Sequence, residues 1–225
     1  MTTRVPMTTG RLVVLMIAVP LVLIIIGWAG LSEVSYAGHA SYPVRLDVSA
    51  SGRTVTIRAN AGNLNVRQLS RAAGSRFRLT GTARYSLVRS TVTWRKTTFG
   101  VIVVSRCHFV LGQCSFSYQL AQPAGSRTVL SSASGDIRFR ALTSTDVTVS
   151  DDQGDVILTF TNVPDRVIVS DQLGDVTLVL PPGATTYRVR ARTLLGDKSI
   201  GVPTSPSSAH VITVTNSSGD ISITN

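Results

Sequence analysis

The sequence predicts an all-β domain in which repeated units stack into a solenoid, preceded by one transmembrane helix. Three observations point to this fold class. Gly-Asp dipeptides recur at a near-constant period, apolar and polar residues alternate on both sides of each dipeptide, and a long apolar stretch lies near the amino terminus. The first two observations concern the architecture of the domain, and the third concerns its location.

The Gly-Asp dipeptides follow one another at steps of 19, 20, 22 and 23 residues over the last part of the chain. A period of this length is typical of solenoids, in which each repeat is one supersecondary unit. Because no single unit can bury its own apolar side chains, neighbouring units must stack on one another. The five dipeptides are Gly135-Asp136, Gly154-Asp155, Gly174-Asp175, Gly196-Asp197 and Gly219-Asp220.

Apolar residues alternate with polar ones before and after each dipeptide, as at Val147 and Val149 before one turn and Val156 and Leu158 after it. An alternation of period two indicates a strand with one buried face, so each unit supplies two short strands joined by a turn. The fourth unit deviates, because Lys198 occupies its first apolar position. An antiparallel meander of hairpins would show the same alternation and is the alternative to a stacked solenoid.

Stacked turns would bring the aspartates of successive dipeptides to within about 4.8 Å of one another. Repulsion between such neighbours amounts to about 1 kcal/mol per pair in water, so an opposing interaction is needed. We expect each carboxylate to accept backbone N–H groups of its own turn. Calcium along this ladder is less favoured, because the sequence lacks the Gly-Gly-x-Gly-x-Asp pattern of calcium-binding β-rolls.

Residues 12–31 form an uncharged, mostly apolar stretch that, as a helix, rises about 30 Å and matches the thickness of a bilayer. Arg4 and Arg11 precede it, and no basic residue follows until Arg45, which predicts a cytoplasmic amino terminus at the plasma membrane. A cleaved signal peptide is the alternative, although its apolar core would span only about 7 to 15 residues. Both interpretations export the rest of the chain.

The predicted organisation is a cytoplasmic tail (1–11), a transmembrane helix (12–31), a linker (32–43) and one extracytoplasmic β-domain (44–225). Residues 42–66 show the alternation of the repeat with turns of their own. The period is lost between about residues 67 and 125. We interpret this segment as an irregular, arginine-rich insertion that forms a β layer capping or flanking the solenoid.

The two cysteines, Cys107 and Cys114, are separated by six residues, a natural length for a disulfide across a hairpin. A disulfide agrees with export. A metal site that uses both thiolates and His108 is the alternative, but it lacks a fourth ligand at a usable spacing.

Charge is distributed unevenly along the chain. Residues 32–130 contain 13 basic and 2 acidic residues, whereas residues 131–225 contain 7 basic and 10 acidic ones. Outside a membrane, the basic half favours anionic lipid headgroups or anionic wall polymer over nucleic acid. The competing interpretation is a solvated arginine-rich face without a ligand. The basic residues concerned are Arg53, Arg58, Arg67, Arg71, Arg76, Arg78, Arg84, Arg89, Arg95 and Lys96.

Catalytic, cofactor-binding and metal-binding motifs are not recognisable in the sequence. Its histidines are His39, His108 and His210, and none occurs in a pattern with serine, cysteine or carboxylate that indicates nucleophilic catalysis. Phosphate-binding glycine loops and zinc signatures are also missing from the sequence. We therefore expect a protein that is not an enzyme and needs no cofactor.

The segment from Val167 to Asp197, in which a Leu-Pro-Pro-Gly turn lies between two Gly-Asp steps, resembles the DUF4097 family of proposed adhesins, also called toastrack-type domains. The resemblance extends over roughly residues 44–225, and the arginine-rich, cysteine-bearing insertion departs from it. It implies a stacked β-solenoid on a bacterial surface, with adhesion or sensing of envelope stress as its role. The family supplies no catalytic residues.

Together these features predict a membrane-anchored, non-catalytic surface module that binds anionic envelope components as an adhesin. The alternative is a sensor or regulator of envelope stress that works through a membrane partner. A cytoplasmic tail of eleven residues without a recognisable motif favours display over signalling. Whether the chain forms a homo-oligomer is left open by the sequence.

Overall fold

The computed structural model describes residues 39–69, 76–108, 113–123 and 125–225. The chain divides into two compact units, Met1–His39 and Ala40–Asn225, and the second contains the folded domain. The predicted cytoplasmic tail, transmembrane helix and most of the linker lie outside the described residues. Within the described ranges, no helix long and apolar enough to cross a membrane occurs.

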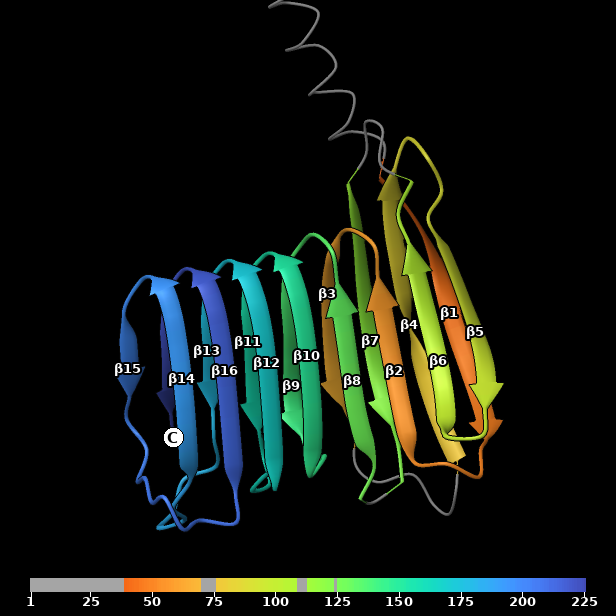
Figure 1. The fold of residues 1–225 in the computed structure, drawn as a ribbon. Helices are drawn as coiled ribbons and strands as arrows, with labels where there is room; N and C mark the ends of the chain where they lie inside the picture. Colours follow the sequence, from red (N-terminus) through yellow and green to blue (C-terminus); the bar gives the residue numbers. More distant parts are fainter. Residues whose placement is uncertain (1–38, 70–75, 109–112, 124) are drawn as a thin grey trace, which may run out of the picture. The chain divides into compact units, whose positions relative to one another are not determined.

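The domain consists of two sheets that face each other, as the all-β prediction requires (Figure 1). Sheet A has nine strands and sheet B has eight. In spatial order, sheet A contains β1 (His39–Ser49), β4 (Arg76–Ser86), β7 (Cys114–Ala121), β3 (Asn63–Gln68), β9 (Ile137–Leu142), β11 (Val156–Phe160), β13 (Val176–Val179), β17 (Ile221–Thr224) and β15 (Lys198–Ile200). Sheet B contains β14 (Arg188–Leu195), β16 (Val211–Ser218), β12 (Arg166–Leu173), β10 (Asp146–Gln153), β8 (Arg127–Ser132), β2 (Thr54–Ala59), β6 (Gly100–Arg106) and β5 (Thr91–Thr97).

Each repeat contributes one strand to each sheet, and we call such a strand-turn-strand pair a rung. The strands of successive rungs pair in parallel and in register, with Val147 opposite Val167 in sheet B and Leu158 opposite Leu178 in sheet A. These four side chains are fully buried between the sheets. The predicted stacking is therefore confirmed for the repeats, and the antiparallel meander is excluded for them.

The spatial order of the last two rungs differs from their order in the sequence. The rung β16/β17 lies between β12/β13 and β14/β15, because the chain first builds β14/β15 one position further out and then returns to fill the gap. The fourth Gly-Asp unit is therefore the terminal rung. This position explains why Lys198, which lies in register with buried Ile221, is tolerated in an apolar column: its rung faces solvent on one side.

The segment in which the sequence period is lost contains a further rung. Strands β6 and β7 pair in parallel with β2 and β3, so they extend the stack at the end opposite β14/β15. Beyond them, β4 and β5 pair in antiparallel fashion with β7 and β6 and broaden both sheets. The sequence period is lost here because the segment between β6 and β7 contains no Gly-Asp dipeptide.

That turn is closed by the predicted disulfide between Cys107 and Cys114. Cys114 immediately precedes Ser115, which lies in register with Asn63, so the half-cystine occupies the position that Gly62 holds in the next rung. The Asn60 side chain extends the pairing, because it accepts the N–H of Cys107 at 2.7 Å and donates to its carbonyl at 3.0 Å. The metal site with His108 is therefore wrong, since both sulfurs are bonded to each other.

We expect the double substitution Cys107→Ser, Cys114→Ser to lower the free energy of unfolding by about 2 to 3 kcal/mol, because the bridge restricts a short loop in the unfolded chain. Urea denaturation of both proteins measures this difference. A reductant should destabilise the wild-type protein by a similar amount and leave the double variant unchanged. An equal stability of the two proteins under oxidising conditions would contradict the expected contribution.

Candidate functional site

The glycines of the Gly-Asp turns are required by the close approach of successive rungs. Gly174 has a φ of +149°, and a Cβ atom there would lie 2.1 Å from the carbonyl oxygen of Gly154. Gly219 has a φ of +126°, and its Cβ would lie 2.0 Å from the carbonyl oxygen of Gly174. An L-residue at these positions meets both a strained backbone and a backbone clash.

The aspartates of the turns form the predicted ladder, but their hydrogen bonds differ from the expectation. Four carboxylates, those of Asp136, Asp155, Asp175 and Asp220, accept the backbone N–H of the aspartate in the adjacent rung, and not an N–H of their own turn. The amide oxygen of Asn63 takes this place for the N–H of Asp136. This arrangement gives each of the four carboxylates a donor where like charges come close together. The donor and acceptor pairs are Asp136 to Asn63 (3.0 Å), Asp155 to Asp136 (3.3 Å), Asp175 to Asp155 (3.0 Å), Asp220 to Asp175 (2.8 Å) and Asp197 to Asp220 (2.8 Å).

The aspartate ladder therefore has a structural role in holding the turns in register. In the part of the chain that the structure describes, no group of three or more His, Cys, Asp or Glu side chains is arranged to hold a metal ion.

The arginines that the sequence analysis singled out are distributed over both sheets. Arg76, Arg78 and Arg84 are exposed on β4 of sheet A, whereas Arg58 and Arg95 are exposed on sheet B. Some have local partners: Asp47 lies 3.1 Å from Arg78 and 3.9 Å from Arg76, and the guanidinium of Arg89 lies 4.8 Å from the centre of the Tyr42 ring. Arg71 lies outside the described residues.

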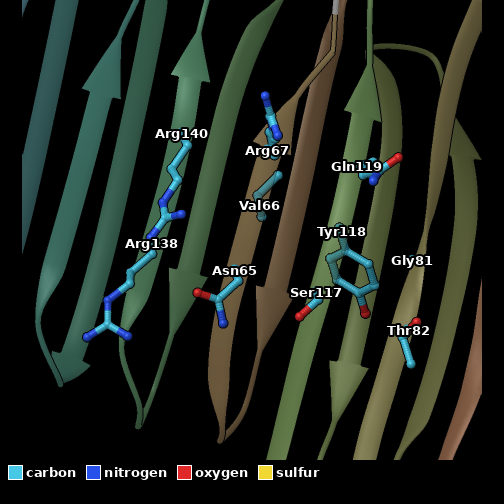
Figure 2. Close-up of a pocket in the computed structure, with 10 residues that line it drawn as sticks. All are labelled: Asn65, Val66, Arg67, Gly81, Thr82, Ser117, Tyr118, Gln119, Arg138 and Arg140. Atoms are coloured by element: carbon cyan, nitrogen blue, oxygen red, sulfur yellow. The ribbon is translucent and has the colours of Figure 1, made fainter.

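Three arginines meet in one groove on the outer face of sheet A (Figure 2). Arg67 comes from β3, and Arg138 and Arg140 come from the adjacent strand β9, where Arg140 lies directly in register with Arg67. The groove has a volume of about 340 Å³. Its other lining residues are Asn65, Val66, Gly81, Thr82, Ser117, Tyr118 and Gln119.

Local backbone features shape this groove. The register between β9 and β11 shifts after Phe139, and Ala141 adopts a φ of +59°, so a bulge follows directly after Arg140. Bulges of this kind re-aim neighbouring side chains. On the other side of the groove, a Cβ at Gly81 would lie 2.0 Å from the carbonyl oxygen of Ser117. This glycine allows close approach of β4 to β7 and leaves the groove open.

The groove carries a net positive charge. Arg138 forms an ion pair with Asp136 at 2.9 Å. Among the described residues, no carboxylate lies within ion-pair distance of Arg67 or Arg140. None of the lining residues is His, Cys, Asp or Glu, and the three arginines supply hydrogen-bond donors to the groove. A guanidinium offers five donors in a planar fork that matches phosphate and carboxylate groups.

Sequence reasoning identified Arg67 but missed Arg138 and Arg140, because these two lie in the acidic half of the chain. The signal for their orientation was present: Ile137 and Phe139 alternate with them and are fully buried, which places both arginines on the outer face. Their proximity to Arg67 depends on the pairing of β9 with β3, two strands far apart in the sequence.

The stacked sheets and the solvent-exposed groove together define a β-repeat domain with an arginine-lined groove on the outer face of sheet A. Residues 117–224 match the sequence profile of the Toastrack DUF4097 family.

Two crystal structures resemble the chain at 14% sequence identity. A proposed cell adhesion protein from Clostridium sporogenes ATCC 15579 has a TM-score of 0.60, with 82% of this chain and 99% of that chain covered, and shares its fold. A proposed adhesin from Bacteroides fragilis NCTC 9343 has a TM-score of 0.32, with 82% and 97% covered. No curated protein matches the chain.

Proposed function

We propose that this protein is a membrane-anchored, non-catalytic surface module that binds anionic envelope components in the groove formed by Arg67, Arg138 and Arg140. The observation that carries the proposal is the clustering of three guanidinium groups with a single ion-paired carboxylate, Asp136. Like charges placed side by side repel one another, so such a cluster favours a bound anion. The name of the Clostridium sporogenes structure, which shares this fold, agrees with the proposal without deciding the ligand.

Two features of the chain support the proposed membrane anchor and the extracytoplasmic location of the domain. Residues 12–31 have the length and composition of a membrane-spanning helix, and the arginines before them favour a cytoplasmic amino terminus. The disulfide between Cys107 and Cys114 agrees with an oxidising, extracytoplasmic environment.

The spacing of the arginines suits a polymer of repeated anionic groups. Arg138 and Arg140 are two residues apart on one strand, a distance of about 6.8 Å, and Arg67 lies one strand away, at about 4.8 Å. Uncharged donors such as Asn65, Ser117 and Gln119 extend the groove across β3 and β7. Glycerol-phosphate diesters provide suitable anions, whether they belong to a wall polymer or to a phosphatidylglycerol headgroup.

The test uses the full-length protein in a neutral detergent and measures its affinity for poly(glycerol phosphate) and, separately, for soluble glycerophosphoglycerol. The groove variant combines Arg67→Gln, Arg138→Gln and Arg140→Gln. Its matched control combines Arg58→Gln, Arg95→Gln and Arg106→Gln, which removes the same charge from exposed positions on sheet B.

We expect the groove variant to bind poly(glycerol phosphate) about 100-fold more weakly than wild type, since each lost charge-assisted contact costs about 1 kcal/mol or more. The control should change affinity by less than about threefold, and binding should weaken as salt rises. Binding of the polymer but not of the small headgroup would assign the site to wall polymer, and comparable binding of both would assign it to lipid. Equal losses in the two variants, or no binding, would refute the site.

A further inference from the structure

Strand β14 is the edge of sheet B and has a partner on one side only, β16. The N–H of Arg188 donates to the carbonyl of His210 at 2.8 Å, which directs the backbone groups of residues 188, 190 and 192 toward β16. In a parallel ladder, alternate residues bond to opposite sides. The N–H and C=O groups of Val189, Ala191 and Thr193 therefore point to the free edge, where no described strand pairs with them.

The loop before β16 covers only the beginning of this edge. Tyr187 donates its N–H to the carbonyl of Pro203 and accepts the N–H of Ser205, both at 2.9 Å, and the loop then turns away. A hollow of about 360 Å³ remains between this loop and the first residues of β14.

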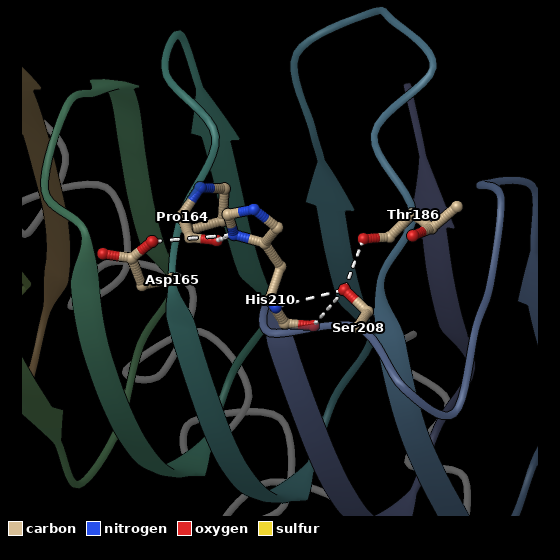
Figure 3. A network of polar contacts seen from close by, with 5 residues as sticks. All are labelled: Pro164, Asp165, Thr186, Ser208 and His210. Atoms are coloured by element: carbon tan, nitrogen blue, oxygen red, sulfur yellow. Dashed lines mark hydrogen bonds and ion pairs between the residues drawn. The ribbon is translucent and has the colours of Figure 1, made fainter.

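A polar network holds the loop in this position (Figure 3). Ser208 donates its hydroxyl to the carbonyl of Thr186 at 2.6 Å and accepts the N–H of His210 at 3.1 Å. Nδ1 of His210 lies 2.9 Å from the carbonyl oxygen of Pro164. These bonds tie the loop to the residues just before β12 and β14, and its backbone bonds to this edge are those at Tyr187.

The two sheets differ in how their edges are protected at this end of the stack. The edge of sheet A, β15, is three residues long and carries Lys198 in an otherwise apolar column, and short strands and inward-facing charges both discourage pairing with another chain. Strand β14 is eight residues long and contains neither a proline nor an acidic residue. Its edge is therefore the one suited to accept a strand.

The charge of β14 determines the kind of strand that fits. Arg188, Arg190 and Arg192 occupy alternate positions on one face, and no described carboxylate lies within ion-pair distance of them. A second copy of β14 paired at this edge would place its three arginines on the same face of the extended sheet, where like charges repel. A strand with Asp or Glu at alternate positions would instead pair each guanidinium with a carboxylate.

We propose that β14 is a binding site for an acidic, extended polypeptide segment, which adds to sheet B as a further strand. The backbone of Val189, Ala191 and Thr193 supplies the hydrogen bonds, and the three arginines select the acidic side chains. Main-chain bonds provide affinity and side chains provide specificity in this mode of recognition. The site lies at the edge of sheet B, whereas the arginines of the groove lie on β3 and β9 in the middle of sheet A, so it is independent of the function proposed for that groove.

The probe is the blocked peptide Thr-Glu-Val-Glu-Val-Glu-Thr, and its control carries glutamine in place of each glutamate. Hydrogen exchange of the full-length protein reports on the edge directly. We expect the acidic peptide to slow exchange of the amides of Val189, Ala191 and Thr193 at least tenfold, and the control peptide to have little effect. Amides of β15 should not respond.

Two variants separate the backbone from the charge contribution. Ala191→Pro removes a donor that faces the free edge and should abolish peptide binding while the bonds to β16 persist, because proline is tolerated at such edge positions. Arg190→Gln should weaken binding about tenfold without changing the thermal midpoint. Peptides that are N-methylated at alternate residues test the same hydrogen bonds without any change to the protein. Methylation of the residues whose N–H groups face β14 should block binding, and methylation of the other alternate residues should not.

Equal binding of the acidic and glutamine peptides, or no protection of the three amides, would overturn the proposal. Protection of these amides that depends on protein concentration in the absence of peptide would also overturn it, since the occupant would then be a second copy of the chain.

Discussion

Gly219→Ala is expected to destabilise the protein by at least about 3 kcal/mol, because it combines an unfavourable positive φ with overpacking against a neighbouring backbone. The added Cβ would lie 2.0 Å from the carbonyl oxygen of Gly174, an atom fixed in the adjacent rung. Neither turn can move away without breaking the in-register pairing of β12 with β16. Urea denaturation of purified protein measures the loss, and failure to fold at 37 °C is its extreme form.

Gly183→Ala is the matched control for this substitution. Gly183 has a φ of +147°, but no atom lies within 4 Å of the position of its Cβ. The control therefore reports the conformational cost alone, about 1 to 3 kcal/mol. A similar loss in the two variants would show that the close approach of the turns contributes nothing.

Asp151→Asn is expected to stabilise the protein by about 2 to 4 kcal/mol at pH 8. Asp151 and Asp171 lie in register on adjacent strands and are 1% and 3% exposed. Burial raises the pKa of Asp151 to about 7, with a further contribution from the charge of Asp171, and burial raises the pKa of Asp171 to about 6.

The sign of the pH dependence follows from these raised values. Between about pH 4, where an unfolded aspartate titrates, and about pH 7, the folded protein binds more protons than the unfolded chain. The stability contributed by the protonated pair is therefore fully present below pH 4 and is lost as pH rises to 7. Asparagine retains the neutral form at every pH, so the variant should lose less stability over this interval.

A neighbouring rung shows that asparagine fits this column. Asn216 lies in register with Asp171, donates to the carbonyl of Gly174 at 2.7 Å and accepts the N–H of Ser218 at 3.2 Å. Asp152→Asn is the control, because it removes one charge from an exposed position beside the buried pair. Thermal unfolding of the variants at pH 4.5 and pH 8 measures the effect. A stability of Asp151→Asn that falls with pH as steeply as that of wild type would contradict the assignment.

The parts of the fold that the sequence predicted are those repeated in every unit. A Gly-Asp turn flanked by alternating apolar residues determines two strands, their inner faces and an in-register stack, and these were confirmed. The order of the last two rungs could not be predicted, because β14 and β16 carry similar patterns and each could pair with β12. Lys198 was the one local sign of a terminal position.

The arginine groove could be predicted only in part. Alternation places Arg138 and Arg140 on an outer face, but their meeting with Arg67 depends on a pairing between distant segments that no local pattern specifies. The rung β6/β7 was missed because Cys114 replaces the glycine of its turn. The transmembrane helix at residues 12–31 stays a prediction, since it lies outside the described residues.

The neighbours of each strand determine both the groove and the free edge, and cysteine cross-linking tests them most directly. Thr177, Ser222 and Ser199 lie side by side in register on β13, β17 and β15. Adjacent strands are about 4.8 Å apart, within reach of a disulfide, whereas alternate strands are about 9.6 Å apart and beyond it. We expect Thr177→Cys to cross-link with Ser222→Cys and not with Ser199→Cys. Cross-linking of residues 177 and 199, with none between 177 and 222, would show that the rungs follow sequence order and would contradict the structure.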